Sequence, residues 1–538
     1  MRTPILGTAL LATILVTGAA TAQEAKHGGR MVLTYKDDIS TLDPAIGYDW
    51  QNPSIMQAIF DGLMDYRPGT FELVPDLAES YTVSDAGRTY TFKLRHGVKF
   101  HNGREMTAED VRYSFERILN PATQSPAQGY FNVIAGSDEF AAKGGHVSGI
   151  TLSDPYTVSI TLKQAKATFL NVLAMHFGSV VPKEEVDKYG ADFGHHPVGT
   201  GAFKLVEWTP GQHLLLQRNK DYFKPDLPHL DEVEIQVGQD PSVSLLRLKK
   251  GEVDLTGDGI PPAQFQSVIA DPALKNQVIA GKQLQTSYLA LNTQVPPLDD
   301  VRVRRAINMA INKERIVRII NNRAVPASQP LPPRMPGYDP NYKGYPYDPE
   351  GAKKLLSEAG HPNGFETTLY SINTDPNPRI AQAIQQDLAQ IGIKAELKAL
   401  ASSVVIQAGG TPKEAPMIWS GGMAWIADFP DPSGFYWTIL GCGGATQGGW
   451  NWAWYCNNEI DERAAKADAM VGAGESATRV QIWRSIFLDV MKDAPWVPIF
   501  HEDFYTVHSQ RLAGAENYFV SPTHIPIYYE MLYATDAQ

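Results

Sequence analysis

Cysteines, long hydrophobic runs and catalytic motifs are all scarce in this sequence. Only two of its 538 residues are cysteines. No apolar run reaches the roughly 18 residues that a membrane-spanning helix needs. The signatures of serine hydrolases, P-loop proteins, dinucleotide-binding proteins and zinc proteases are absent. We therefore expect no membrane-spanning segment, no enzymatic activity and no cofactor.

The histidines do not form a pattern that binds metal. His501 and Glu502 begin like a zinc-protease motif, but the chain continues Asp503-Phe504-Tyr505 without a second histidine. His195 and His196 are adjacent, so in an extended segment their side chains would point to opposite faces. We expect no bound metal.

Charge and length limit the partners and the architecture. The chain carries 47 Lys and Arg against 59 Asp and Glu, a net charge of −12. This sign argues against nucleic acid and anionic membrane surfaces as partners, although a local pocket can still suit an anionic ligand. At 538 residues the chain exceeds what one hydrophobic core usually supports, so two or more lobes are expected.

The first 22 residues have the pattern of a secretory signal peptide. Arg2 precedes an apolar run from Ile5 to Val16, and Ala20-Thr21-Ala22 forms an A-x-A cleavage pattern. No cysteine that could carry a lipid anchor lies nearby. Cleavage after Ala22 would release a free protein into the periplasm of a two-membrane bacterium; an uncleaved anchor is the alternative.

The two cysteines are Cys442 and Cys456, far from the signal. In an exported chain, an even and closely spaced pair favours a disulfide. Closing a loop of about 15 residues would stabilise the fold by roughly 3 kcal/mol in the chain-entropy model. Two free thiols are the alternative.

Strand and helix patterns alternate along most of the chain, which indicates mixed α/β lobes. The alternation in Tyr90-Thr91-Phe92-Lys93-Leu94 predicts a half-buried strand. Thr107 stands three residues before Asp110, which predicts a capped helix start. Arg379 to Gly392 has apolar residues at helical spacing and predicts an amphipathic helix.

Several segments resemble one known family in wording and in order. They are the stretch from Leu73 to Pro121, VGTGAFKLVEWTPG, LALNTQVPPLDDVRVRRAINMAINKERIV, YDPEGAKKLLSEAG and WVPIFHEDFYTV. They are similar to segments of the large extracytoplasmic solute-binding proteins of ABC importers, in the dipeptide- and oligopeptide-binding family (family 5). The likeness spans nearly the whole chain after the signal.

The resemblance implies an α/β fold of two lobes with an extra subdomain inserted in the first lobe. Two hinge strands are expected near Tyr288–Asn292 and Pro498–Tyr505. The boundaries it implies are a signal peptide over residues 1–22, a first lobe over 23–75 and 197–287, the additional subdomain over 76–196, a second lobe over 288–503 and a return to the first lobe over 504–538.

The richest candidate site lies within Ala424–Cys442, where aromatic residues crowd around two aspartates. In peptide-binding members of the family, a motif similar to W-x-x-D-x-x-D-P-x-x-F places its first aspartate against the peptide's ammonium. That position here is Asp428, with Trp425 and Phe429 as expected neighbours of the ligand. Alternatively, Asp428 is a structural hydrogen-bond acceptor and Trp425 belongs to the core. Asp431 is expected to cap the following turn or helix.

A second candidate is the loop that follows the first predicted strand. Tyr48 and Trp50 could stack on a ligand, and Asp49 could accept a hydrogen bond from it. The alternative is a surface loop with one aromatic residue anchored in the core.

One departure from the family concerns the other end of a ligand. In related dipeptide binders, an arginine ahead of the helix matching Arg379–Gly392 pairs with the ligand's carboxylate. Residues 370–378 contain no arginine here. Asn373 lies in this stretch and is our candidate contact, while Arg379 is expected to face solvent.

The expected function is that of a periplasmic solute-binding protein. It would trap a peptide or peptide-like solute with an amine by hinge closure and deliver it to an inner-membrane ABC permease. We expect a monomer without nucleic-acid partners. Alternatives are the same fold binding an oligosaccharide, an opine-like conjugate or a metal chelate, a periplasmic chaperone or sensor, or a secreted hydrolase.

Overall fold

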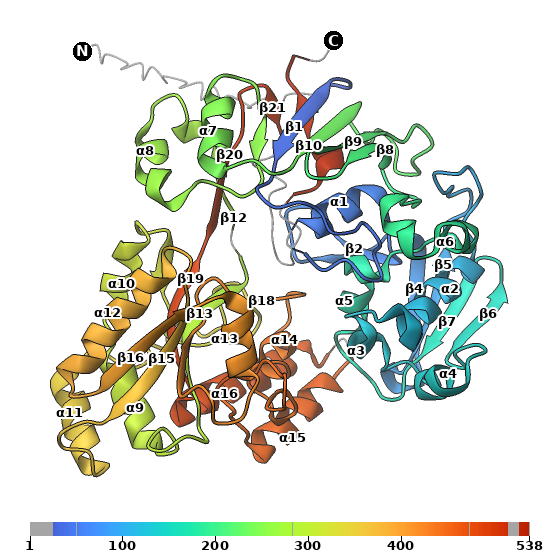
Figure 1. Cartoon of the computed structure of the whole chain (residues 1–538). Helices are drawn as coiled ribbons and strands as arrows, with labels where there is room; N and C mark the ends of the chain where they lie inside the picture. Colours follow the sequence, from blue (N-terminus) through green and yellow to red (C-terminus); the bar gives the residue numbers. More distant parts are fainter. Residues whose placement is uncertain (1–24, 50, 282, 473, 515–526, 537–538) are drawn as a thin grey trace, which may run out of the picture.

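The computed structural model of this protein describes residues 25–49, 51–281, 283–472, 474–514 and 527–536. These residues form two α/β lobes, and the first lobe carries an additional subdomain (Figure 1). The two-lobe architecture and the mixed α/β class predicted from the sequence are confirmed. The predicted signal peptide, its cleavage after Ala22 and Trp50 lie outside the described residues.

The first lobe is built around one mixed sheet. Its elements are β1 (Arg30–Thr34), α1 (Asn52–Ile59), β2 (Met64–Tyr66), β3 (Leu73–Pro75), β8 (Phe203–Thr209), β9 (His213–Arg218), β10 (Glu232–Gln236), α7 (Pro241–Lys249), β11 (Leu255–Thr256), α8 (Phe265–Ala270), β12 (Val278–Gly281), β20 (Phe504–Val507), β21 (Leu512–Ala513) and β22 (Tyr533–Ala534). The sheet has the order β11-β1-β10-β9-β8, in which β1 runs parallel to β10 and β11. The last strands bring the C-terminal part of the chain back to this lobe.

The additional subdomain packs helices on a four-stranded antiparallel sheet. Its elements are β4 (Ala78–Ser84), β5 (Thr89–Leu94), α2 (Ala108–Leu119), α3 (Gln128–Phe131), α4 (Ser137–Lys143), β6 (Ile150–Asp154), β7 (Thr157–Thr161), α5 (Phe169–Leu173) and α6 (Lys183–Tyr189). The strand order is β4-β5-β7-β6. The Thr107 backbone N–H donates to the Asp110 carboxylate at 2.8 Å, which confirms the predicted helix start.

The second lobe holds a seven-stranded sheet between helices. Its elements are β13 (Gln285–Leu291), α9 (Val301–Ala310), α10 (Lys313–Ile319), β14 (Ala324–Pro326), α11 (Pro349–Glu358), β15 (Glu366–Ile372), α12 (Asn377–Gln390), β16 (Lys394–Leu400), α13 (Ser402–Gly409), β17 (Met417–Trp419), β18 (Trp425–Ile426), α14 (Ser433–Tyr436), α15 (Asn458–Asp468), α16 (Ser476–Asp493) and β19 (Trp496–Glu502). The sheet has the order β14-β19-β13-β17-β15-β16, and β18 pairs with β13. The predicted apolar face of α12 is buried through Ile380, Ile384 and Leu388.

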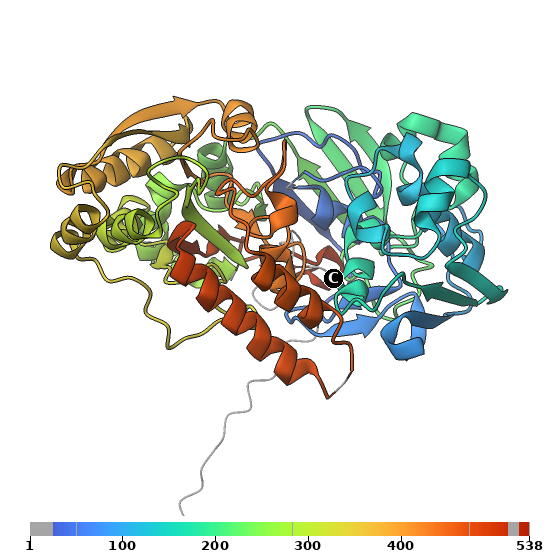
Figure 2. The same ribbon diagram turned by 90° about the horizontal axis from the view of Figure 1, so that it is seen from below.

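Two strand connections join the lobes. In the first lobe β12 pairs with β20, and in the second lobe β13 pairs with β19, both in antiparallel register. The chain therefore crosses once between β12 and β13 and once between β19 and β20. Seen from below (Figure 2), the second lobe, mostly yellow to red, lies beside the blue-to-green first lobe. The residue boundaries given above for the lobes stay a prediction.

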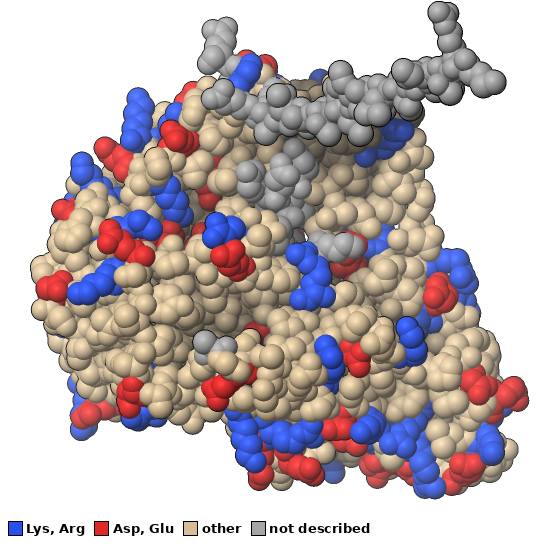
Figure 3. All heavy atoms as spheres, turned by 180° about the vertical axis from the view of Figure 1, so that it is seen from behind, with Lys and Arg blue, Asp and Glu red and all other residues tan. Residues whose placement is uncertain are grey.

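The surface and the helix lengths add two observations. On the face seen from behind (Figure 3), basic and acidic side chains are intermixed. Among the described residues, no helix is both long enough and apolar enough to cross a membrane.

Candidate ligand-binding site

The loop between β18 and α14 places Asp428 at the boundary between the lobes. Asp431 fixes this loop: its carboxylate accepts a hydrogen bond from the Ser433 backbone N–H at 3.0 Å and two from Arg479 of α16, at 2.6 and 2.9 Å. The first contact matches the cap predicted for Asp431. A buried, bidentate arginine–carboxylate pair holds the loop in one geometry.

Asp428 joins the second lobe to both parts of the first. Its side chain is buried, with 3% of the residue surface exposed. The Tyr48 hydroxyl donates to one carboxylate oxygen at 2.5 Å, and the Tyr130 hydroxyl donates to the other at 2.6 Å. Tyr48 lies in the loop before α1 and Tyr130 in α3. The three side chains form what we call the Asp428 cluster.

Burial and charge keep both phenols of this cluster protonated. Burial raises the pKa of Tyr48 and of Tyr130 far above the ordinary tyrosine value, and the neighbouring Asp428 carboxylate raises it further. Both hydroxyls therefore donate at any physiological pH. In such a water-poor place a carboxylate attracts a cationic group more strongly than at the surface.

Phe429, beside Asp428, packs into the first lobe. It is 4% exposed and belongs to a hydrophobic cluster whose other members all lie between residues 45 and 180. Its ring meets that of Tyr130 edge-on, with 6.2 Å between the centroids. The residue comes from the second lobe, so this burial depends on the two lobes being in contact.

Sequence reasoning missed two parts of this boundary. Tyr130 lies in a four-residue helix without a recognisable motif. Lys166 of the additional subdomain forms an ion pair with Asp468 at the end of α15, and the Ala167 backbone N–H donates to the Asp468 carbonyl oxygen at 2.8 Å. No local pattern in the sequence signals contacts between segments roughly 300 residues apart.

Comparison with known proteins gives the family. The model for bacterial extracellular solute-binding proteins, family 5 (Middle), matches residues 72–447. The glutathione-binding protein GsiB of Escherichia coli O1:K1 is 30% identical over 510 residues, which cover 94% of each chain. This chain belongs to the family-5 solute-binding proteins.

Two solved structures of periplasmic binding proteins are similar along nearly their whole length. DppA from Helicobacter pylori, an ABC transporter-associated protein in complex with peptide STSA, is 30% identical with a TM-score of 0.78, covering 95% of this chain and 98% of that one. AgaA from A. tumefacien R10, in complex with agropinic acid, is 26% identical with a TM-score of 0.76, covering 95% and 99%. The predicted family is confirmed, and its named relatives are binding proteins.

In this family-5 protein the loop before α1 contacts the second lobe through Tyr48, which donates to Asp428. The Tyr48 ring lies 5.4 Å from that of Phe177, centroid to centroid. Asp49 accepts hydrogen bonds from Ser40 and, at 3.5 Å, from Asn52, so its contacts stay within the first lobe. Tyr48 thus meets Asp428 directly, whereas Asp49 stabilises its own loop.

Trp425 lies three residues before Asp428, on β18 beside the start of β13. It is half-buried, and its ring centroid is 6.5 Å from that of Trp450, which is 40% exposed. The indole N–H of Trp425 is buried without a hydrogen-bond partner among the described residues.

Asn373 is exposed at the end of β15, where its backbone N–H donates to the Leu400 carbonyl oxygen at 2.9 Å. Arg379 is also exposed and forms a bidentate pair with Asp375, at 2.7 Å for both contacts. This matches the solvent-facing position predicted for Arg379. Asn373 is joined to Leu400 of β16, and none of its hydrogen bonds to described residues reaches the Asp428 cluster.

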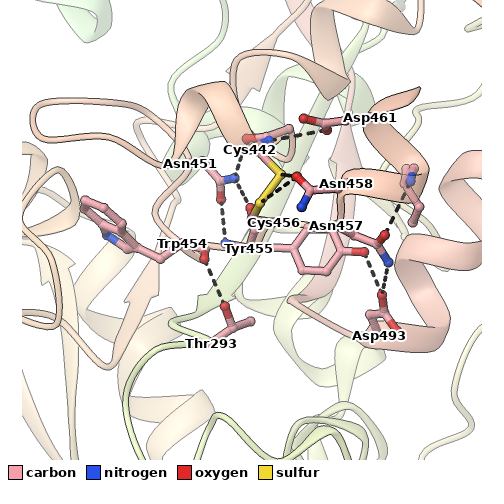
Figure 4. Close-up of a disulfide and its surroundings, with 12 residues drawn as sticks. Thr293, Cys442, Asn451, Trp454, Tyr455, Cys456, Asn457, Asn458, Asp461 and Asp493 are labelled. Carbon is pink, nitrogen blue, oxygen red and sulfur yellow. Dashed lines mark hydrogen bonds between the residues drawn. A yellow bond between two sulfur atoms is a disulfide. The ribbon is translucent and has the colours of Figure 1, made fainter. Parts of the chain in front are cut away.

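The predicted disulfide between Cys442 and Cys456 is confirmed (Figure 4). The loop that it closes is also held by Asn451, whose side-chain amide donates to the carbonyl oxygens of Gly441 and Tyr455. Thr293, just after β13, donates to the Trp454 carbonyl oxygen at 3.0 Å. The disulfide therefore fixes a loop that rests on the central sheet of the second lobe.

No group of three or more His, Cys, Asp or Glu residues within the described part of the chain is arranged to hold a metal ion.

Proposed function

We propose that this family-5 protein captures a peptide or peptide-like solute with a free amine and passes it to an ABC importer of the inner membrane. The observation that carries the proposal is the Asp428 cluster. A buried carboxylate, held by one tyrosine from each part of the first lobe, stands where the two lobes meet. A ligand ammonium is the group that such a site favours most.

The ligands of the relatives agree with an amine-bearing solute. GsiB is named for glutathione, and DppA was solved with the peptide STSA. Both compounds are peptides with a free α-amino group. An ammonium held by Asp428 would leave the rest of such a ligand between the lobes, beside Tyr48 and Trp425.

The proposed mechanism is hinge closure. Contacts from both lobes to one solute stabilise the closed form, which the permease subunits then recognise. Phe429 and the Lys166–Asp468 pair join the two lobes, so in this mechanism opening of the hinge would separate them. We propose that the mature protein acts as a periplasmic monomer, after cleavage at Ala22, without turnover and without a cofactor.

An opine-like conjugate is the second candidate ligand. Arg379 is engaged with Asp375 at the surface, and residues 370–378 offer no other arginine for a peptide carboxylate. AgaA, solved with agropinic acid, is a relative with a ligand of this other class.

The test is to identify what the protein carries. Native mass spectrometry of protein purified without refolding should release a compound with a primary amine. Calorimetric titrations of protein freed of its bound compound, with STSA, glutathione and agropinic acid, then rank the ligand classes by affinity. Binding of at least one amine-bearing peptide is expected. Measurable turnover of the bound compound, or a preference for unfolded chains over every small solute, would contradict the proposal.

A further inference from the structure

A pocket of about 200 Å³ lies between the additional subdomain and the second lobe, next to the Asp428 cluster. Tyr130, Phe169 and Val172 line it from the first lobe, and Phe429 and Trp437 from the second. Tyr130 and Phe429 are shared with the neighbourhood of Asp428. Asp428, Tyr48 and Trp425 themselves do not line this pocket, which we call the interlobe pocket.

The walls of the interlobe pocket are mostly aromatic and aliphatic. Lys166 is the one ionic side chain among the described residues that line the pocket. It forms an ion pair with Asp468, and the Trp437 indole N–H donates to the same carboxylate at 2.8 Å. The charges at the rim are therefore matched within the protein. A concave, mostly apolar space with a few polar groups is the usual form of a small-molecule site.

Two helical glycines leave this space open. Gly129 in α3 has no heavy atom within 4 Å of the position where a Cβ would stand, and at Gly434 in α14 the nearest atom is Phe429 Cε2 at 3.9 Å. Neither glycine has a positive φ, so neither backbone requires glycine. Both glycines line the pocket, so a side chain at either position would enter it.

We propose that the interlobe pocket is a second binding site, which takes a small neutral molecule with an aromatic ring or a branched alkyl group. A dry apolar cavity of about 150 Å³ is enough to hold benzene, so this pocket suits a ring of that size with one polar substituent. The paired Lys166 and Asp468 leave no net charge to favour an ionic ligand.

Occupation of this site favours the closed form. One wall comes from α3 and α5 and the opposite wall from α14, so the complete pocket exists only while the two lobes are in contact. A ligand that binds only the closed arrangement shifts the equilibrium toward it. The coupling is reciprocal, and so a solute that closes the main cleft also strengthens binding in the interlobe pocket.

The binding test uses indole and phenol as probes. Wild-type protein is titrated while the indole N–H resonance of Trp437 is followed by NMR, and a saturable shift is expected. Gly129→Leu and Gly434→Leu place side chains in the space and should weaken probe binding by at least about tenfold. Gly443→Leu is the matched control, because Gly443 is exposed and its Cβ position is also open.

Two results would overturn the second site. One is the absence of any saturable Trp437 shift in the wild-type protein at millimolar probe. The other is equal probe affinity in the two filled variants and the control. If a filled variant does not fold, the Trp437 shift in the wild-type protein still decides whether the second site exists. Loss of the second site leaves the proposed function intact, since no residue of the Asp428 carboxylate contact is altered.

The coupling to closure needs a separate measurement. Spin labels at Asp138 and Glu459, both exposed and on opposite sides of the boundary, report the distance between the lobes. The native cysteines are paired and do not compete for label. Indole should increase the short-distance population in the labelled protein and leave the labelled Gly129→Leu variant unchanged. An identical distance distribution with and without indole would contradict the coupling.

Discussion

The protein has two clusters of buried acidic residues, one between the lobes and one inside the first lobe, and their positions give them different roles. The Asp428 cluster is shared by both lobes, so its contacts change when the lobes separate. The second cluster surrounds Lys224 and belongs wholly to the first lobe. A buried charge that bridges moving parts affects ligand binding, whereas one enclosed in a single lobe affects stability.

The Lys224 cluster places four carboxylates around one ammonium. Lys224 Nζ lies 2.7 Å from Asp76, 3.8 Å from Asp61 and 3.9 Å from Asp65, and its charge also acts on a fourth buried acid, Glu530. All four acids are at most 6% exposed. Burial raises the pKa of Asp61 to about 6, of Asp65 to about 8 and of Glu530 to about 7. One lysine does not balance four buried negative charges, so the cluster retains protons near neutral pH.

The largest expected effect is the loss of the cation from the Lys224 cluster. Lys224→Met leaves the buried carboxylates without a counter-charge and should lower the free energy of unfolding by roughly 3–5 kcal/mol. Urea unfolding followed by circular dichroism measures this. Lys143→Met is the control, since the Lys143–Glu139 pair is exposed and such pairs contribute little. Equal unfolding midpoints for the two variants would refute the role of Lys224.

The same cluster predicts the pH dependence of stability. Where the folded pKa of an acid is raised, the folded protein binds more protons than the unfolded chain, so the contribution of this cluster to stability falls as pH rises between about 4 and 8. One such proton corresponds to about 2.7 kcal/mol between pH 5.5 and 7.5. Asp65→Asn should flatten this slope, measured by urea unfolding across the pH range, while Asp138→Asn at the surface should not. Equal slopes in the parent protein and in Asp65→Asn would contradict the account.

A substitution of Phe429 tests the role of contacts at the boundary between the lobes. Its burial exists only between the lobes, so Phe429→Ala should weaken binding of a cleft ligand by about thirtyfold, about 2 kcal/mol, with little change in the melting temperature of the unliganded protein. Phe131→Ala removes a buried ring of the same hydrophobic cluster, but one supplied by the first lobe itself. That variant should instead destabilise the fold. Similar effects of the two changes on stability would show that Phe429 is an ordinary core residue.

Local sequence signals predicted the parts of this structure that local physics decides. The capped start of α2 and the buried face of α12 follow from the spacing of a few residues. The disulfide followed from export and from the closeness of its cysteines. The two-lobe arrangement was predicted from the resemblance to a family, because the hydrophobic periodicity alone does not indicate it.

The contacts that the sequence did not predict join segments that are far apart in the chain. Tyr48 and Asp428 were each singled out, but 380 residues separate them, and nothing local indicated that they would be hydrogen-bonded to each other. Tyr130 and the Lys224 cluster carry no motif at all. Their acids and phenols gain unusual pKa values only after folding has buried them together.

The most direct test of the central claim is a cycle of four affinities. Wild-type protein and Asp428→Asn are titrated with the tightest-binding amine of the ligand panel and with its N-acetylated form, and Asp375→Asn serves as an exposed control on the same lobe. The account predicts that Asp428→Asn weakens binding of the free amine by at least about tenfold, about 1.4 kcal/mol. Binding of the acetylated form should stay nearly unchanged. Equal losses for both forms, or none for either, would contradict it.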